Sequence, residues 1–195
     1  MIDNQTIEVY NQKKDEYRKL VERPASRSLV DFIKVVRPNG FVLDLGCGPG
    51  MASSLMEKSG LRSDPVDASI EMVNLANKTY DLGARQEEFA SIHGENVYDG
   101  IWANFSLLHA RKVDFKLHIK ALYKVLKPNG YFSIGMKLGK GEGRDEIGRF
   151  YAYYTETELI EHLVKCGFNL CEIYHGEEMG LVGAVEPWIM LRLRK

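Results

Sequence analysis

The chain has 195 residues, with 26 lysines and arginines against 27 aspartates and glutamates, and a formal net charge of −1. Hydrophobic residues make up 45% of it and charged residues 27%, which are the ordinary proportions of a globular protein. The near-neutral balance argues against a general nucleic-acid-binding protein, which normally carries a clear cationic excess. No apolar run approaches the roughly 20 residues that span a bilayer, so we expect no membrane partner.

Cysteine usage and the N-terminus indicate the compartment. The three cysteines, Cys47, Cys166 and Cys171, are an odd number at unremarkable spacing, which favours free thiols over a disulfide framework. The first 20 residues are charged throughout and have no apolar core of a signal peptide. We therefore expect one cytoplasmic domain over residues 1–195, either a monomer or a homodimer.

In the first half of the chain, short β-type runs alternate with helical stretches, the pattern of an α/β fold. Apolar residues at helical spacing predict a helix over residues 29–36. Phe41–Leu45 is a continuous apolar run, as expected of a parallel strand buried on both faces. A glycine cluster and a helix that closes at Gly60 follow, and Ser69 is a plausible N-cap for the next helix.

The second half continues the alternation. Residues 98–103 read as a strand, and the apolar stripe from Phe115 to Leu126 predicts a helix with a solvated lysine face. The turn at residues 127–130 is expected to end that helix before a strand over 131–134. Thr155 opens a capping box for the last helix. Two strands near 168–174 and 188–193 have no room for a helix between them, so they are expected to pair antiparallel.

Residues 137–154 form the longest stretch without a clear pattern. They hold four glycines among charged residues and end in a tyrosine-rich run. Loops of this length in a compact domain are usually lids, binding loops or disordered segments. We expect a substrate loop or lid here.

The most informative segment is the strand-to-helix turn from Asp44 to Gly50, DLGCGPG. Glycines let the backbone approach a ligand closely and adopt positive φ. A dinucleotide site needs a third glycine where this chain has Met51 or Ser53. An aspartate before the turn suits a cofactor with an ammonium group better than a pyrophosphate. Asp67, 19 positions after Gly48, is placed to bind ribose hydroxyls.

These segments resemble the class I S-adenosylmethionine-dependent methyltransferases. The blocks VLDLGCGPG, VDAS, YDGIWANFSLLHA and VLKPNGYF match that family in order and spacing, and the resemblance covers residues 25–195. It implies a doubly wound, Rossmann-like, seven-stranded and mostly parallel sheet with an antiparallel C-terminal strand pair, and a helical cap over residues 1–24. The chain further resembles a subgroup of small bacterial methyltransferases linked by analogy to tellurite resistance.

The resemblance also implies S-adenosylmethionine as the cofactor and a set of contacts to it. Tyr17, or Tyr10, would cover the cofactor from the N-terminal helix. The remaining implied cofactor-binding residues follow the ends of successive strands: Asp44, Gly46, Cys47, Gly48, Asp67, Ala68, Met72, Gln86, Glu87, Asn104 and Phe105. One departure from the pattern is Pro65 in the second strand, where a proline removes a ladder donor, so that strand is expected to be short or bulged.

Methyl transfer from a sulfonium needs mainly alignment of the acceptor, and a general base is required only if the acceptor must lose a proton. His109 is the catalytic candidate, because it follows Asn104 and Phe105 closely. The expected acceptor is a small molecule and not a nucleic acid, since residues 104–107 read NFSL in place of an Asn/Asp-Pro-Pro-aromatic motif. The substrate-binding candidates are Lys137, Arg144, Arg149, Tyr151 and Tyr153.

Two alternatives stay open. A non-catalytic S-adenosylmethionine-binding module would bind the cofactor without transferring its methyl group. A nicotinamide-dependent oxidoreductase fits less well because of Asp44 and Met51. The histidines show no metal-ligand spacing and no cysteine–histidine cluster exists, so no metal is expected.

Overall fold

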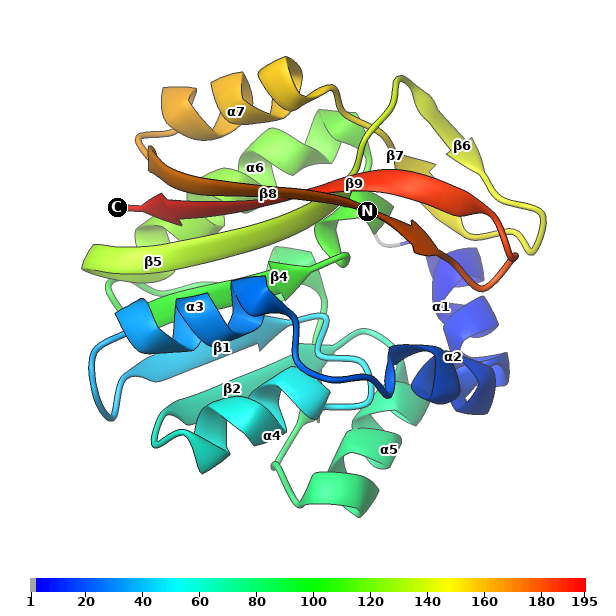
Figure 1. Ribbon diagram of the computed structural model, residues 1–195, viewed down its shortest axis with the longest axis horizontal. Coiled ribbons are helices and arrows are strands. Elements are labelled where there is room, and N and C mark those ends of the chain that lie inside the picture. Colours follow the sequence, from blue (N-terminus) through cyan, green and yellow to red (C-terminus); the bar gives the residue numbers. More distant parts are fainter. Residues whose placement is uncertain (1–2) are drawn as a thin grey trace.

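The computed structural model describes residues 3–195, and its centre is a seven-stranded sheet with the strand order β3-β2-β1-β4-β5-β9-β8 (Figure 1). The first five strands run parallel, whereas β9 is antiparallel to both of its neighbours. This confirms the Rossmann-like sheet and the antiparallel C-terminal pair. The strands are β1 Phe41–Leu45, β2 Arg62–Asp67, β3 Arg85–Gln86, β4 Tyr98–Asn104, β5 Leu126–Lys137, β8 Asn169–Met179 and β9 Val185–Arg194.

Helices cover both faces of the sheet. Successive residues of β1 point to opposite faces, so Val42 packs with α3 and α4 while Leu43 packs with α6 and α7. Both faces of β1 and β4 are thereby buried, which explains their continuous apolar runs. The helices are α3 Arg27–Val35, α4 Met51–Lys58, α5 Ile70–Tyr80, α6 Lys112–Val125 and α7 Glu156–Lys165, with short 3₁₀ turns η1 Phe89–Ser91 and η2 Leu107–His109.

Side-chain caps begin several of these helices at the positions that the sequence predicts. The Ser69 hydroxyl accepts a hydrogen bond from the Met72 amide at 3.1 Å, and the Thr155 hydroxyl accepts one from the Glu158 amide at 3.2 Å. Each bond satisfies one of the amides that a helix leaves free in its first turn. These local signals fix the starts of α5 and α7.

Two expectations about individual strands were wrong in detail. β5 begins at Leu126, five residues before the predicted Tyr131, because Leu126 already pairs with Tyr98 and Pro128 holds Lys127 in an extended conformation. β2 is neither shortened nor bulged at Pro65, which pairs in register with Asp44. β3 pairs only with Val66 and the residue after it, so the outer ladder begins beyond the proline.

Residues 137–154 contain a β-hairpin where the sequence predicted a loop. β6 (Glu142–Arg144) and β7 (Phe150–Ala152) pair antiparallel as a separate two-stranded sheet. The Asp145 carboxylate closes the turn by accepting from the amides of Ile147 and Arg149 at 3.2 and 2.8 Å. Strands of three residues carry too little periodicity to be recognised among so many glycines.

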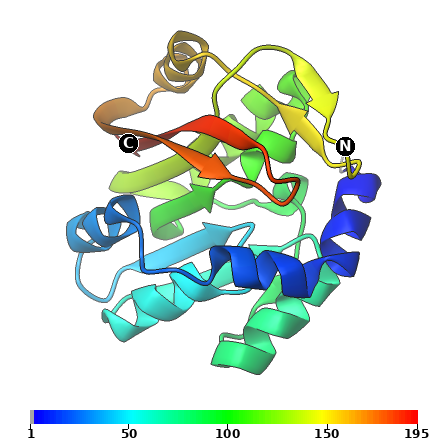
Figure 2. The ribbon, with the colours of Figure 1, turned by 45° about the vertical axis from the view of Figure 1, so that its right-hand side comes forward.

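Two N-terminal helices, α1 Asn4–Gln12 and α2 Lys14–Val21, run across the carboxyl ends of the parallel strands (Figures 1 and 2). Residues 1 and 2 of the expected cap lie outside the described residues. The Phe150 amide donates to the Thr6 hydroxyl at 2.8 Å, and the Ser69 hydroxyl donates to Asn11 at 2.7 Å. α1 is therefore bonded to β7 on one side and to α5 on the other. Within residues 3–195, no helix is long and apolar enough to cross a membrane.

Candidate active site

Two adjoining cavities lie at the carboxyl ends of β1, β2 and β4, beneath α1 and α2. The smaller has a volume of about 100 Å³ and the larger about 560 Å³. Ligands of α/β sheets bind at this edge, where the strand order reverses, and here it reverses between β1 and β4. Seven residues line both cavities and join them into one site: Tyr10, Tyr17, Gly46, Gly48, Asn104, Phe105 and His109.

The turn after β1 forms the floor of this site and requires glycine. Gly46 has a φ of +74° and Gly48 of +53°, in the region that side chains disfavour. A Cβ on Gly46 would lie 2.3 Å from the Cβ of Ser106, and one on Gly48 would lie 3.4 Å from the Tyr17 ring. The turn thus presents bare backbone to the cavities.

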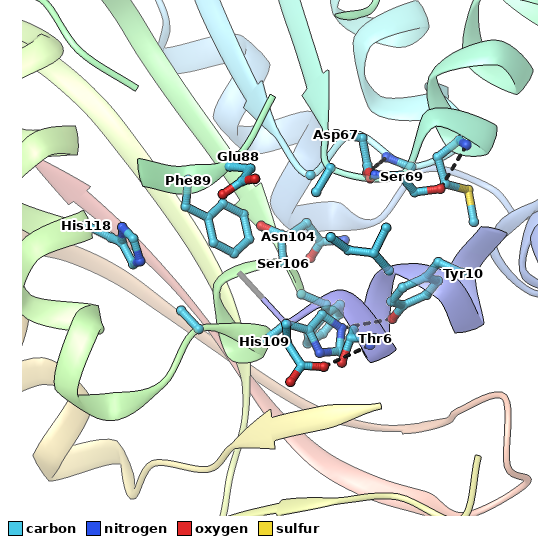
Figure 3. A pocket seen from close by; sticks show the side chains of 18 of the residues that line it. Thr6, Tyr10, Asp67, Ser69, Glu88, Phe89, Asn104, Ser106, His109 and His118 are labelled. Carbon is cyan, nitrogen blue, oxygen red and sulfur yellow. Dashed lines mark hydrogen bonds between the residues drawn. The ribbon is translucent and has the colours of Figure 1, made fainter. Parts of the chain in front are cut away.

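Asp67, at the end of β2, lines the smaller cavity and is held in place by backbone donors. Its carboxylate accepts from the Ser69 amide at 2.8 Å (Figure 3) and from the Gly48 amide at 2.9 Å. Burial raises the pKa of this carboxyl, and the two amide bonds oppose that rise. Its remaining lone pairs are free to accept hydrogen bonds from a diol.

Asp44, in β1, borders the larger cavity and is only 2% exposed. Among the described residues its hydrogen-bond partner is Ser53, whose hydroxyl donates to the carboxylate at 2.7 Å. Burial is the main cause that raises the pKa of Asp44 to about 7; hydrogen bonds from Ser53 oppose the rise, and the nearby Asp67 charge adds to it. A buried carboxylate with one neutral partner is stabilised by a cation, so this corner of the cavity favours an ammonium group.

Part of the wall of the smaller cavity is apolar and includes Ala68, Met72, Phe89 and Ala90. Glu88 lies beside Phe89 in this wall (Figure 3). These walls can hold a flat ring, with a carboxylate at the rim to accept from an exocyclic amine.

Two residues expected near this ring lie elsewhere. Gln86 donates its side-chain amide to the Ala68 carbonyl at 2.9 Å, and Glu87 pairs with Arg85 at 2.8 Å. Neither lines a cavity, and Glu88 and Phe89 occupy the wall in their place. β3 is only two residues long, so the sequence contained no pattern that could fix the register here.

Asn104 and Phe105 stand where the two cavities meet, at the end of β4. Phe105 has a φ of +54°, a strained conformation for an aromatic residue that costs about 1–3 kcal/mol. Its amide donates to the Gly135 carbonyl at 3.1 Å, and its ring meets Trp188 edge to face with centroids 6.1 Å apart. These contacts hold the strained turn beside the glycine floor.

His109 lies between α1 and the β6–β7 hairpin. Its Nδ1 is 2.6 Å from the Phe150 carbonyl oxygen, which only accepts, so Nδ1 carries the proton. Nε2 then accepts from the Tyr10 hydroxyl at 2.9 Å (Figure 3). Burial is the main cause that lowers the pKa of His109 to about 4; the hydrogen bond to Phe150 opposes the fall, and the Arg149 charge adds to it. The imidazole is neutral and its free lone pair is engaged, so the geometry favours a positioning role over the catalytic role expected from the sequence.

The five substrate-binding candidates separate into two groups. Lys137, Arg149 and Tyr151 line the larger cavity. Arg144 and Tyr153 line neither cavity; Arg144 pairs with Asp3 at 2.7 Å, and the Tyr153 hydroxyl donates to Glu186 at 3.2 Å.

The outer wall of the larger cavity was missed by sequence reasoning. It combines the segment after α2, from Arg23 to Ser26, with the β8–β9 hairpin from Glu177 to Leu181. Arg23 and Glu178 pair across the two at 2.6 Å. They are 155 positions apart, and no local sequence pattern predicts such a contact. Among residues 3–195, no group of three histidine, cysteine or acidic side chains is placed to hold a metal.

Part of the chain is similar to known methyltransferases. Residues 42–130 match the family model described as a methyltransferase domain. An uncharacterized methyltransferase of Staphylococcus carnosus is 24% identical over 147 residues, which cover 67% of this chain and 71% of the relative.

Solved structures share the fold at low identity. The Burkholderia thailandensis 1,6-didemethyltoxoflavin-N1-methyltransferase, determined with its substrate and S-adenosylhomocysteine, superposes with a TM-score of 0.75 at 20% identity, over 98% of this chain and 88% of that one. The [4+2]-cyclase SpnF superposes with a TM-score of 0.74 at 16% identity, over 100% and 96%.

The methyltransferase-domain match over residues 42–130 and the fold shared with solved methyltransferases support S-adenosylmethionine as the cofactor. The donor set fits that molecule. Asp44 can pair with its ammonium group, and Asp67 can accept hydrogen bonds from its ribose hydroxyls. The apolar wall around Phe89 can hold its adenine ring, and the glycine turn leaves room for its methionine chain next to the protein backbone.

Proposed function

We propose that this chain is a working class I S-adenosylmethionine-dependent methyltransferase that methylates a small molecule by in-line transfer. The observation that carries the proposal is the continuity of the two cavities. One end holds the acidic pair Asp44 and Asp67 around the glycine turn, and the other opens toward Lys137, Arg149 and Tyr151. A donor and an acceptor can therefore lie in one enclosed space.

The cofactor half of the site would be filled by S-adenosylmethionine, which supplies the methyl group when bound. Asp67 would accept from the ribose hydroxyls, and Asp44 would pair with the ammonium. Asn104 and Phe105, where the cavities meet, would border the reacting centre. Tyr10 and Tyr17 line both cavities from above and would exclude water from it.

The shape of the larger cavity supports a small acceptor. Its 560 Å³ lies within the range of about 300–1,000 Å³ typical of small-molecule pockets. The segment after α2 and the β8–β9 hairpin close its outer side through the Arg23–Glu178 pair. The similar Burkholderia enzyme, by its name, methylates the small molecule 1,6-didemethyltoxoflavin. A nucleic-acid acceptor fits this enclosure poorly.

Catalysis would rest on alignment. Holding the acceptor in line with the methyl group contributes up to about 7–11 kcal/mol in favourable cases. The rigid elements are the strained Phe105 turn and the hydrogen-bonded chain from Tyr10 through His109 to Phe150. His109 would hold α1 and the hairpin at a fixed spacing around the acceptor.

An acceptor screen tests the proposal. The purified protein is incubated with S-adenosylmethionine and pools of small phenols, thiols and heteroaromatic amines, and S-adenosylhomocysteine is measured by mass spectrometry. We expect acceptor-dependent product that Asp67→Ala abolishes. Tight cofactor binding with no product in any pool, as for a chain that uses this fold without methyl transfer, would favour a cofactor-binding module instead.

A further inference from the structure

The acceptor end of the larger cavity has aromatic walls. Phe105 and Trp188 meet edge to face, and the Tyr151 ring lies 4.8 Å from that of His109, centroid to centroid. Phe105, Trp188 and Tyr151 all line the cavity, and Tyr151 is only 2% exposed. Flat walls of this kind select a planar ring.

Two cations lie along the same walls. Lys137 Nζ is 4.1 Å from the centre of the Tyr151 ring and pairs with Glu186. Arg149, 3% exposed, donates from Nε to Asp145 at 2.8 Å and from Nη1 to the Tyr10 hydroxyl at 3.2 Å.

The Arg149 guanidinium retains unused donors. Nη2 forms an ion pair with the Asp145 carboxylate at 2.8 Å, but it is buried and makes no hydrogen bond. Asp145 does not line the cavity whereas Arg149 does, so the cationic side of this pair faces the acceptor.

Around the cavity, the groups that could remove a proton are already engaged. Nε2 of His109 accepts from Tyr10. Glu178 pairs with Arg23, and Glu186 pairs with Lys137.

Two further carboxylates line the cavity away from its aromatic end. Asp44 lies at the glycine turn, where the cofactor ammonium would neutralise it. Glu177 is exposed at the rim, on the β8–β9 hairpin. Among the cavity-lining residues of the described chain, therefore, no general base faces the aromatic walls.

We propose that the acceptor is an aromatic anion of the phenolate or thiophenolate type, which binds after losing its proton to solvent and is held by Arg149 and Lys137. This inference rests on the proposed function and narrows its substrate class. Tyr10 and Tyr151, whose burial raises their pKa values, remain protonated and add no competing negative charge.

The reaction then balances without a protein base. A lone pair on the acceptor oxygen or sulfur forms the bond to the methyl carbon while the carbon–sulfur bond of the sulfonium breaks, and that bonding pair stays on the departing sulfur. An anion and a cation become two neutral products. No proton moves to or from the protein, which agrees with a His109 locked in its neutral form.

Binding of 4-nitrophenol tests this directly, because its ionised form absorbs visible light. The probe is titrated with pH in the presence of protein saturated with S-adenosylhomocysteine. We expect the pKa of the bound probe to be lower than that of free probe by about one unit, which means that the anion binds about tenfold tighter than the neutral phenol. If the neutral phenol binds wild-type protein as tightly as the anion does, the inference is wrong, and no variant is needed to show it.

Variants show which residues lower the pKa of the bound probe. Arg149→Met and Lys137→Met are each expected to lose most of the pKa shift of the probe, and Arg149→Lys to keep part of it. Arg111→Met, at an exposed arginine outside both cavities, is the matched control and should change nothing.

The carboxylate at the cavity rim is tested in the same way. Glu177→Gln should leave the shift intact, and its loss in this variant contradicts the inference. Failure to bind S-adenosylhomocysteine at all would instead remove the proposed function, so the two failures are distinguishable.

Discussion

Single residues at this site are arranged for binding at a cost in stability. Asp44 is the clearest case, because it is buried with one neutral partner and its pKa is raised to about 7. Between pH 4 and 7 the unfolded chain holds this group ionised while the folded chain keeps it protonated. The free energy of unfolding therefore falls as pH rises through that window and is lowest above it.

The first prediction is that Asp44→Asn stabilises the protein while abolishing cofactor binding. The amide keeps an acceptor for Ser53 and removes the buried charge, so at pH 8 we expect a gain of about 1–3 kcal/mol in the free energy of unfolding. Urea unfolding of the variant and the wild-type protein at pH 8 measures this gain. A less stable variant at that pH would contradict the assignment.

The contrasting control is Asp99→Asn. Although burial raises the pKa of Asp99, hydrogen bonds from Arg37, the Phe41 amide and Lys127 outweigh it and lower the pKa overall. Its contribution to stability is present above its unfolded pKa and is lost as pH falls. We expect this variant to be less stable at pH 8, with the opposite sign to Asp44→Asn.

The second prediction concerns the pH dependence of cofactor binding. Protonated Asp44 has no charge to pair with an ammonium, so affinity for S-adenosylhomocysteine should fall about tenfold per pH unit below pH 7. His109, with its pKa lowered to about 4, adds no inflection near pH 6. Fluorescence titrations from pH 5 to 8 test both statements. An inflection near pH 6 that disappears in His109→Asn would mean that the imidazole titrates after all.

At the scale of elements, the strand-to-helix turn was predictable because its signals are local. Asp44 to Gly50, the Ser69 cap and the Thr155 cap each follow from neighbouring residues. The β6–β7 hairpin was not, because its strands span three residues each and depend on contacts with α1.

The third prediction compares two glycines with the same backbone conformation. Gly50 and Gly60 both have a φ of +86°, but a Cβ on Gly50 would lie 2.6 Å from Leu82 and 2.9 Å from Ala76, whereas one on Gly60 meets nothing within 4 Å. Gly60→Ala should cost about 1–2 kcal/mol of backbone strain, and Gly50→Ala a further 1–3 kcal/mol, in round figures, from overpacking. If the two variants unfold at the same denaturant concentration, the overpacking cost at Gly50 is absent, which would mean that helix α4 shifts freely away from α5.

The whole molecule is organised so that distant segments complete the site. His109 depends on Phe150 and Tyr10, 41 and 99 positions away, and Arg23 reaches Glu178 across 155 positions. The alternation of strands and helices and the position of the glycine turn could be predicted from periodicity and motif spacing, whereas the seven-stranded sheet followed from the family resemblance. The identity of Glu88 as a wall residue and the locked state of His109 depend on long-range packing, which a single sequence does not encode in any local pattern.

The fourth prediction follows from the closure of the site by the N-terminal helices. The Arg23–Glu178 pair is half-exposed, so salt screens it and the outer wall should loosen as ionic strength rises. We expect hydrogen exchange in residues 177–186 to quicken at high salt and to slow when S-adenosylhomocysteine binds. Exchange that is indifferent to the ligand would place this wall outside the functional site.

The most direct test of the account is calorimetric titration of the protein with S-adenosylmethionine and S-adenosylhomocysteine, with NAD as the control. The account predicts saturable binding of the first two at one site per chain, no binding of NAD, and loss of binding in Asp67→Ala. Preference for NAD, or binding that survives Asp67→Ala and Asp44→Asn unchanged, would contradict the assignment of the glycine turn and its two carboxylates as the cofactor site.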